Sequence, residues 1–465
     1  MVKHPPSKNK LLSLIWGFIL SFIFILPVEA KVFNAESFKL ENGLEIIVIP
    51  KKTAPVVTSM IWYKVGAADE PQGKSGMAHY FEHLMFKGTS TLAPGDFSKT
   101  IRKLGGNDNA FTGQDYTAYF ETISTDKLAQ VLRMEADRMV NLSPPPEHFA
   151  SEKNVVLEER RQRTENDPKG LFSEQMLSAL YTNHPYGTPV IGWMDEIKEY
   201  QWEDVKKFYD IWYAPNNAIL ILSGNITAKD VQPIVQEAFG NIPKKEIPPR
   251  SRTTIPPSIG STTMVLNHET INQPTFQNVR IVPSYAENKS DSLALQVLQE
   301  ILSGGPTTRL YKHLVVDQKK AISVGFSYDS SALNDSTLWI SGTPAEGVSL
   351  EELENLVENE IKNIITNGVS DLEVKEAIQR LQDAAVFVRD SVSGPAMIFG
   401  QELTTGSTVE NVENWPENIN LVTPQQIQNI AQKYLDSENP WRRTSITGHL
   451  LPLSKSSAER KEDLK

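Results

Sequence analysis

Hydrophobic and polar residues follow two periods along this chain, one typical of strands and one typical of helices. Residues 38–50 (FKLENGLEIIVIP) contain two strand-like runs on either side of Asn42-Gly43, a dipeptide that favours a hairpin turn. Strands followed by helices occur in both halves of the chain, which predicts an α+β fold. Further strand-like runs are TSMIWYKVG (58–66), TAYFETI (117–123), TFQNVRIVPS (275–284) and TLWISGTPA (337–345). Helical patterns cover residues 75–87, 96–104, 127–141, 147–164, 291–303, 349–366 and about 370–390.

The first two of these helices have suitable residues at their expected ends. Ser75 can cap the start of the first helix, and Gly88 can end it. In the second helix Asp96 follows Pro94-Gly95, so we expect Asp96 to be the N-cap. The sequence therefore predicts that residues 75–87 form a short, separately capped helix.

A proline-rich segment divides the chain into two blocks of similar length. Residues 243–257 (PKKEIPPRSRTTIPP) contain five prolines and four basic residues, a composition typical of semi-rigid linkers. We predict a first domain at 31–242, a linker at 243–262, a second domain at 263–450 and a flexible tail at 451–465. Because the order of strands and helices repeats, the domains are expected to be homologous α/β sandwiches in tandem, each a sheet with helices packed on it.

The first 30 residues have the features of a secretory signal peptide. Three lysines and no acidic residue precede an almost wholly apolar run at residues 11–26, and Val28 and Ala30 are the small residues expected before a cleavage site. An uncleaved membrane anchor is the alternative, since the run nearly spans a bilayer. Pro27 favours cleavage because it interrupts the helix just before the small residues. We predict removal of residues 1–30 and a periplasmic or secreted protein with no further membrane span.

Composition narrows the possible chemistry. A hydrophobic fraction of 40% and a charged fraction of 22% are ordinary for a folded protein. The net charge of −11 and the absence of a long basic run argue against nucleic acid as a partner. The chain has no cysteine, which excludes disulfides, thiolate nucleophiles and Cys-ligated metals. Any metal site must therefore use histidine and carboxylate ligands.

The segment His79-Tyr80-Phe81-Glu82-His83 carries the most specific chemical signal. His79 and His83 are spaced i and i+4, so on a helix they share one face and can bind one ion. Neutral imidazoles suit zinc, and Glu82 beside them could take a proton from a zinc-bound water. The alternative is that two histidines without a shared function happen to lie on one helix. The chain has only eight histidines, so their coincidence in this spacing favours a metal site.

A catalytic zinc usually has three protein ligands, and the predicted helix at 147–164 offers candidates. Glu152, Val156 and Glu159 lie at i, i+4 and i+7, so the two carboxylates share a face. Glu158 is rotated by about 100° from Glu159, and Glu147 is a fourth candidate. Spacing alone does not choose among them, and acidic helix faces are commonly just solvated.

Four segments together resemble the pitrilysin–insulinase family of zinc peptidases, which carry an inverted H-x-x-E-H motif. They are HYFEHLMFKGT, GGNDNAFTGQDYTAYF, EKNVVLEERRQ and HPYGTPVIGW, and the likeness covers nearly all of residues 34–450. The pattern is most similar to the short two-domain branch of bacterial proteins and mitochondrial processing peptidases. The resemblance implies a zinc endopeptidase that hydrolyses peptides or unfolded segments, and the predicted signal peptide implies that it is exported.

The resemblance also implies a role for each site residue. His79 and His83 match zinc ligands, Glu82 matches the general base, and Glu159 matches the third ligand. Glu152 matches a supporting acidic residue seven positions earlier. One zinc ion per chain is expected.

The segment 107–112 resembles the family's edge strand beside the zinc, where an extended substrate can add by main-chain hydrogen bonds. Asn109 and Ala110 are the residues expected to bind substrate there, although an ordinary buried strand is the alternative. His184, in His-Pro-Tyr-Gly, matches a structural turn near the site, and we expect no contact with the metal. The isolated histidines at 148, 268, 313 and 449 are expected to be surface or packing residues.

The second half departs from the family's catalytic pattern. Leu295, Leu298 and Gln299 occupy the positions of His, Glu and His, so this half is expected to bind no zinc. Catalytic members also carry an Arg and a Tyr in the second domain that reach the substrate. Ile322 occupies the Tyr position here, and neither Val315 nor Gln318 supplies the Arg.

The resemblance therefore implies a chain that works with a homologous partner carrying the Arg/Tyr pair. A heterodimer is favoured over a homodimer, and the partner would provide the donors that polarise the scissile carbonyl. A non-catalytic structural or peptide-binding subunit of the same fold is the alternative function. The complete zinc motif and Glu82 argue against it.

Overall fold

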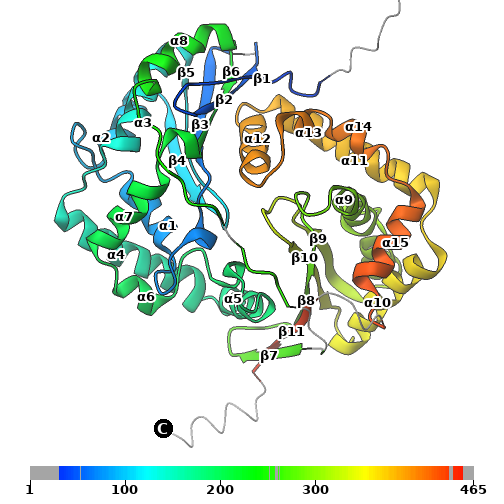
Figure 1. The fold of residues 1–465 in the computed structure, drawn as a ribbon. Coiled ribbons are helices and arrows are strands. Elements are labelled where there is room, and N and C mark those ends of the chain that lie inside the picture. The colour runs from blue at the N-terminus through cyan, green and yellow to red at the C-terminus, as the bar shows by residue number, and fades with distance from the viewer. Residues whose placement is uncertain are drawn as a thin grey trace, which may run out of the picture.

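The described residues form two halves that lie side by side, each built around one β-sheet (Figure 1). In the computed structural model none of the described helices combines the length and the apolar character needed to cross a bilayer. The predicted signal peptide, residues 1–30, lies outside the described residues, as do residues 454–465 of the predicted tail. The structure describes residues 31–52, 54–250, 252–256, 260, 262–438 and 444–453.

The first sheet has six strands in the order β1-β2-β6-β3-β5-β4. Strand β2 runs parallel to β6, whereas the other neighbours are antiparallel. The predicted hairpin joins β1 and β2, with Gly43 at φ +94°, a conformation that favours glycine. The strands are β1 (Glu36–Lys39), β2 (Glu45–Pro50), β3 (Val56–Tyr63), β4 (Asn107–Thr112), β5 (Thr117–Ser124) and β6 (Ala218–Gly224).

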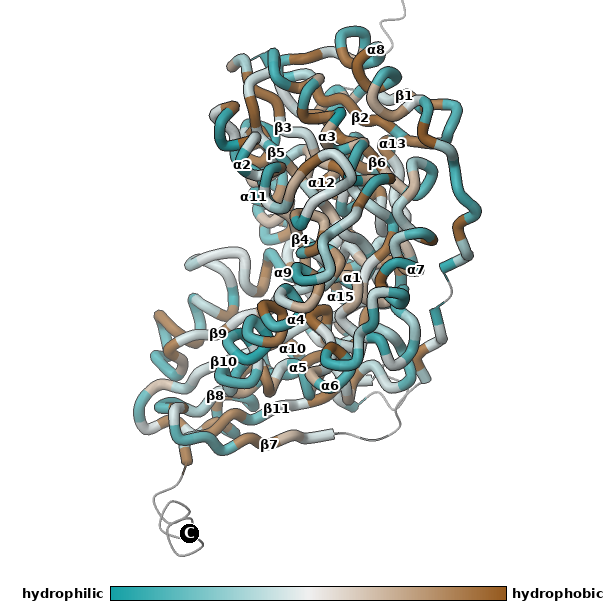
Figure 2. Tube along the Cα trace, turned by 90° about the vertical axis from the view of Figure 1, so that its left-hand side faces the viewer, coloured by the Kyte–Doolittle hydropathy of each residue, from teal (hydrophilic) through white to brown (hydrophobic). Residues whose placement is uncertain are grey.

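Helices of the first half cover one face of this sheet. The hydrophobic residues between these helices and the sheet form the main core of the first half. Ile46 and Val48 of β2 point into that core, while Ile47 and Ile49 point to the opposite face. Hydrophobic residues accordingly run along the central strands of the sheet in Figure 2. The helices are α1 (Met77–Leu84), α2 (Asp96–Lys103), α3 (Leu128–Val140), α4 (Pro146–Arg160), α5 (Pro168–Leu180), α6 (Met194–Lys198), α7 (Trp202–Trp212) and α8 (Ala228–Phe239).

The second sheet repeats the topology of the first without its outermost strand. Its order is β7-β11-β8-β10-β9, and β7 runs parallel to β11 as β2 does to β6. This shared strand order confirms the predicted pair of homologous α+β domains. The strands are β7 (Thr262–His268), β8 (Thr275–Val282), β9 (Ala321–Tyr328), β10 (Ser336–Pro344) and β11 (Ser445–Pro452). The helices are α9 (Lys289–Ser303), α10 (Leu350–Asn367), α11 (Asp371–Asp390), α12 (Gly394–Thr404), α13 (Val409–Glu413), α14 (Trp415–Ile419) and α15 (Pro424–Leu435).

One helix from each half packs on the sheet of the other half. Helix α12 packs on the outer face of the first sheet, where Gly400 lies directly against Trp62 of β3. Helix α5 packs on the second sheet, where Met176 and Phe172 lie against Gly448 of β11. Strand β6 is buried throughout because helices cover both of its faces.

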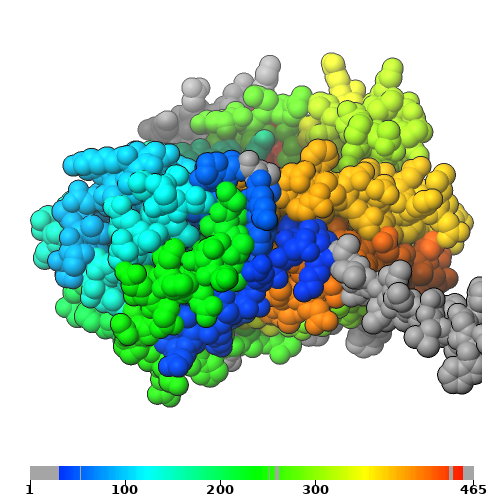
Figure 3. Space-filling view, turned by 90° about the horizontal axis from the view of Figure 1, so that it is seen from above, coloured from blue at the N-terminus to red at the C-terminus, as the bar shows by residue number. Residues whose placement is uncertain are grey.

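The N-terminal segment and the linker also join the halves. The backbone N–H groups of Phe33 and Ala35 donate to the buried carboxylate of Glu413 at 2.9 and 2.6 Å. In Figure 3 this segment, in blue, lies against the orange region of α12 and α13. In the linker, Arg250 and Arg252 form ion pairs of 2.8–3.2 Å with two buried aspartates of the first half, Asp69 and Asp115.

Three predicted helix caps are wrong. Helix α1 ends at Leu84 with Met85 as its C-cap, four residues before Gly88 ends the predicted helix. The N-cap of α1 is Gly76 at φ +84°, while the Ser75 hydroxyl instead accepts a hydrogen bond from the Trp193 backbone N–H at 2.8 Å. The N-cap of α2 is Gly95 at φ +77°, and Asp96 is the first helical residue. At both N-caps glycine provides the left-handed conformation that the entering chain needs. Strand β11 also extends to Pro452, two residues past the predicted end of the second domain.

Candidate metal centre

Helix α1 places His79 and His83 on one face, with ring centroids 4.9 Å apart. The buried carboxylate of Glu70 fixes the start of the helix by accepting from Gly76 and Ala78 N–H, both at 2.7 Å. A Cβ at Gly76 would lie 2.4 Å from the Ile191 carbonyl oxygen, so the helix start is packed directly on a neighbouring loop. The two imidazoles are thus held by a tightly anchored helix.

Helix α4 brings a carboxylate to the same place. Glu159 Oε2 lies 3.7 Å from His79 Nε2 and 3.3 Å from His83 Nε2. One ligand atom from each of the three side chains lies within 4.8 Å of the others, a spacing that one metal ion can bridge. Across the described ranges, no other group of three or more His, Asp or Glu side chains is this close.

Glu152 lies on the far side of His83. Its Oε1 is 2.8 Å from His83 Nδ1, and its Oε2 accepts from Lys87 Nζ at 2.6 Å. A carboxylate on Nδ1 fixes the ring orientation and leaves Nε2 pointing at Glu159, which is the usual arrangement behind a metal-bound imidazole. The donor set therefore fits zinc, both in ligand type and in the group that supports it.

The two imidazoles differ in charge before metal binds. Burial lowers the pKa of His79 to about 4, so this ring is neutral at pH 7. Burial acts in the same direction on His83, but the carboxylates of Glu152 and Glu159 outweigh it and raise its pKa to about 9. The hydrogen bond from His83 in turn lowers the pKa of Glu159.

Glu82 lies beside this donor set without belonging to it. Its Oε2 accepts a hydrogen bond from the Thr112 hydroxyl at 2.6 Å. Burial raises its pKa, and the hydrogen bond from Thr112 offsets part of that rise. A carboxylate with a raised pKa, held beside a metal position, is well suited to accept a proton.

These groups line one cavity of about 740 Å³. Strand β4 is the edge of the first sheet, and β5 is its only partner among the described strands, so its outer edge is suited to bind an extended chain. On this strand Asn109 is exposed and Ala110 is half-buried, and both line the cavity. The full lining comprises His79, Glu82, His83, Phe86, Lys87, Asn109, Ala110, Phe111, Thr112, Glu152, Glu159, Arg163, Thr164, Val190 and Ile191.

Sequence analysis missed Arg163, which also lines the cavity. Its guanidinium is 3.0 Å from Glu159 Oε1, the oxygen that does not face the two histidines. Arg163 belongs to a π-helical turn, η3 (Arg161–Glu165), that continues α4, and its side chain is 73% exposed. The i+4 spacing from Glu159 was the available signal, since such pairs meet on a helix.

The other predicted positions lie apart from the three ligands. His184 is buried and caps a short turn, where its Nδ1 accepts from the Tyr186 backbone N–H at 3.2 Å. His313 and His449 lie beside acidic side chains at 3.0 and 2.7 Å. Together with His148 and His268, they fall outside the metal-binding group found among the described residues.

In the second half, the equivalent positions of the described helix α9 carry Leu, Leu and Gln in place of metal ligands. Leu295 and Leu298 of α9 are fully buried in the second core. Gln299 Oε1 accepts from the Tyr328 backbone N–H at 2.6 Å and so supports β9. Ile322, at the predicted Tyr position, is half exposed on β9, which is the edge strand of the second sheet.

Comparison with known proteins gives matches over both halves. Residues 46–193 match the family described as "Insulinase (Peptidase family M16)", and residues 201–381 match the "Peptidase M16 inactive domain". The zinc protease PqqE of Helicobacter pylori is 33% identical over 345 residues, which are 72% of this chain and 77% of that protein.

Solved structures share the fold. A protease from Helicobacter pylori superposes with a TM-score of 0.83 at 26% identity, covering 90% of this chain and 99% of that one. The periplasmic protease PqqL from Escherichia coli has a TM-score of 0.76 at 18% identity. The match covers 92% of this chain but only 50% of PqqL, so one copy of this fold corresponds to half of that longer chain.

Proposed function

Because this chain belongs to the insulinase (M16) peptidase family, we propose that it is an exported zinc endopeptidase subunit acting on peptides or unfolded segments. The single observation that carries this proposal is the convergence of His79, His83 and Glu159 in one cavity with Glu82. A relative named as a zinc protease, 33% identical, supports the same chemistry.

His79, His83 and Glu159 would hold one zinc ion per chain. Bound there, zinc would act as a Lewis acid on the scissile carbonyl and lower the pKa of a water molecule. Glu152 would keep His83 Nε2 directed at the ion. Arg163 would hold the second oxygen of Glu159, leaving Oε2 for the metal.

Glu82 would carry the protons of the reaction. It takes one from the attacking water and delivers it to the leaving amine, a transfer that suits a carboxylate whose pKa is raised by burial. The Thr112 hydroxyl fixes the rotamer of Glu82 through its 2.6 Å hydrogen bond. The substrate would lie along β4, where Asn109 and Ala110 would form main-chain hydrogen bonds with it.

A homologous partner chain would complete the site. Ile322 and Val315 cannot donate hydrogen bonds to a substrate carbonyl from their side chains. One copy of this fold equals half of the longer PqqL chain, which supports an arrangement of two such units. We propose a heterodimer, rather than a homodimer, in which the partner supplies an Arg and a Tyr.

The alternative function is a non-catalytic structural or peptide-binding subunit. It would need neither three converging ligands nor a partly buried carboxylate beside them, and Glu82 is such a carboxylate. Cleavage of residues 1–30 would deliver the protein to the periplasm or the exterior. The substrate itself is proposed only as a class, peptides or unfolded segments.

One experiment tests both catalysis and the partner. The chain alone, a homologous partner alone and their mixture are assayed on a quenched peptide mixture, each with zinc and after chelation. We expect zinc-dependent cleavage from the mixture and much weaker cleavage from this chain alone, because the Arg and Tyr donors are missing and each such donor contributes about 10²–10³-fold in rate. If the isolated chain is as active as the mixture, the proposed partner is not needed and that proposal is wrong. If no sample cleaves the peptides, the non-catalytic alternative is favoured.

A further inference from the structure

A second cavity, of about 300 Å³, lies beneath helix α11, where the N-terminal segment meets the second half. Leu381, Ala384, Ala385 and Val388 of this helix face it at helical spacing. All buried residues of α11 belong to its first half, up to Ile378, so its last turns cover the cavity and not a packed core. Alanines at two of these positions leave the space that larger side chains would fill.

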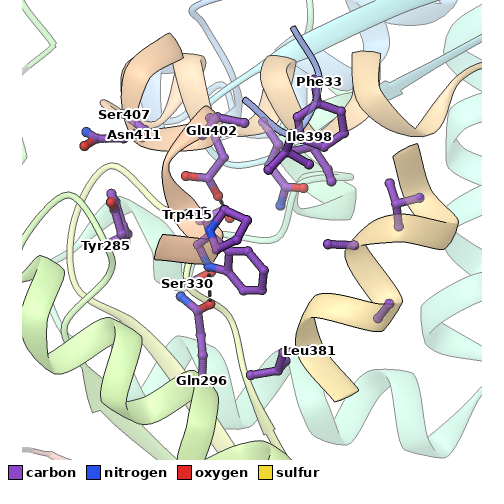
Figure 4. A pocket seen from close by; sticks show the side chains of 18 residues that line it. Phe33, Tyr285, Gln296, Ser330, Leu381, Ile398, Glu402, Ser407, Asn411 and Trp415 are labelled. Atoms are coloured by element: carbon purple, nitrogen blue, oxygen red, sulfur yellow. Dashed lines mark hydrogen bonds between the residues drawn. The ribbon is translucent and has the colours of Figure 1, made fainter. Parts of the chain in front are cut away.

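The cavity has an apolar wall and a polar end. Phe33, Ile398, Val412 and Trp415 add to the apolar wall, and Figure 4 shows the Phe33 ring, the Trp415 indole and the Glu402 carboxyl around the same space. Glu402 Oε1 accepts from the Ser331 hydroxyl at 2.6 Å. No described residue pairs with its second oxygen, which leaves that oxygen available to a ligand.

Tyr285 provides a second unsatisfied group. The residue is 9% exposed, lines the cavity, and its hydroxyl has no hydrogen-bond partner among the described residues. Buried hydroxyls normally have a partner, so this one is suited to a polar atom of a bound molecule. Trp415 Nε1, in contrast, already donates to Gln296 Oε1 at 3.0 Å and presents its ring to the space.

The charges of the residues that line the cavity indicate which class of ligand it can bind. Among the described residues that line the cavity, Glu402 is the only charged one, and none is Lys, Arg or His. Lys289 is not a lining residue, but its ammonium donates to Asn411 Oδ1 at 3.1 Å and lies 5.8 Å from the centroid of the Tyr285 ring, at the rim of the cavity. A carboxylate beside aromatic rings is the combination that recognises organic cations, through an ion pair and cation–π contacts.

We propose that this cavity binds a small organic ammonium ion, with its apolar body under α11 and its ammonium group between Glu402 and Tyr285. The cavity lies outside the proposed zinc site and shares no lining residue with it. The proposal is therefore independent of the peptidase function.

Phenethylammonium is the probe, with 2-phenylethanol as its neutral counterpart and 3-phenylpropionate as its anionic one. Binding to the full chain is followed by thermal shift and by tryptophan fluorescence, with Trp415→Phe identifying the signal from the cavity. We expect the ammonium ion to bind about tenfold more tightly than the alcohol, and the carboxylate to bind least, since a charge-assisted hydrogen bond contributes a factor of this size.

Two variants test the site. Glu402→Gln should lose about tenfold in ammonium affinity and leave alcohol affinity unchanged, while Glu417→Gln, an exposed acid on α14, is the matched control. Ala385→Phe should fill the cavity and abolish binding of all three probes. Equal binding of ammonium and alcohol, an unchanged Glu402→Gln variant, binding retained in Ala385→Phe, or no binding by any probe would each overturn the proposal.

Discussion

Glu152 and His83 form a hydrogen bond of 2.8 Å between Oε1 and Nδ1, although 69 positions separate them in the sequence. The bond joins helix α4 to helix α1 and directs His83 Nε2 towards Glu159 on the same face of α4. One helix thus provides both a direct ligand candidate and the group that orients another.

Replacing Glu152 by Gln should weaken zinc binding by about 10–100-fold, since partners of ligating histidines have effects of this size. The amide keeps the shape of the side chain but loses the charge that stabilises the His83 N–H. Zinc affinity is measured by competition with a chromogenic chelator. Glu158→Gln, on the exposed face of the same helix, is the control and should bind zinc normally. Equal affinities in the two variants would show that Glu152 has no supporting role.

Glu82→Gln should retain about one zinc per chain and lose about 10²–10⁴-fold in kcat, because only the proton acceptor is removed. Metal content is measured by atomic absorption, and turnover is measured in the presence of the partner. Glu159→Gln should instead lose the metal. An active Glu82→Gln variant would rule out the proposed mechanism, and full zinc affinity in Glu159→Gln would show that the third ligand is misassigned.

Zinc uptake should release about one proton at pH 7. His83 has a pKa of about 9 in the metal-free chain, so it is protonated at pH 7 and must lose that proton to bind. His79, with a pKa of about 4, is already neutral and contributes none. Apparent affinity should therefore rise with pH up to about 9. Calorimetry in buffers of different ionisation enthalpy measures the release, and a value near zero at pH 7 would contradict the assigned charge of His83.

Gly400→Ala should destabilise the protein, because a Cβ at this position would lie 1.8 Å from Trp62 Cε2. Overpacking of this kind costs about 1–3 kcal/mol. Gly325→Ala on β9 is the control, since the Ser341 hydroxyl, at 3.3 Å, is the one described group outside its chain neighbours within 4 Å of the added Cβ. Denaturant unfolding gives the comparison, and equal stability of the two variants would mean that α12 does not pack tightly on the first sheet in solution.

The mature protein should begin at Lys31. N-terminal sequencing of protein from the native host tests the predicted cleavage after Ala30. Chains that keep residues 11–26 and sediment with membranes would support the anchor instead.

The local pattern of hydrophobic, polar and turn residues was sufficient to predict most helices and strands and the duplicated fold. Alternation and turn residues located the β1–β2 hairpin, and the repeated order of elements predicted two related domains. Periodicity also placed Glu152 and Glu159 on one face of α4, and both now lie against His83. The roles of these residues stay predictions, since placement alone does not demonstrate catalysis.

The pattern of hydrophobic and polar residues does not reveal contacts between residues that are far apart in the sequence. Ser75 is a good N-cap by type, but its hydroxyl is used by Trp193, which is distant in the sequence. Phe172, Met176 and Leu180 give α5 an apolar face at helical spacing, yet nothing in that spacing says which sheet the face covers. In the sequence Arg163 cannot be distinguished from any exposed arginine, because its role depends on its contact with Glu159 in the fold.

The exchange of α5 and α12 has a consequence for how the chain is made. Domains of most proteins can fold as they leave the ribosome, the first before the second. Here the outer face of the first sheet stays uncovered until α12, which begins at Gly394, has been synthesised. The first half therefore cannot complete its packing until most of the second half has been made, whereas the second half finds α5 already synthesised.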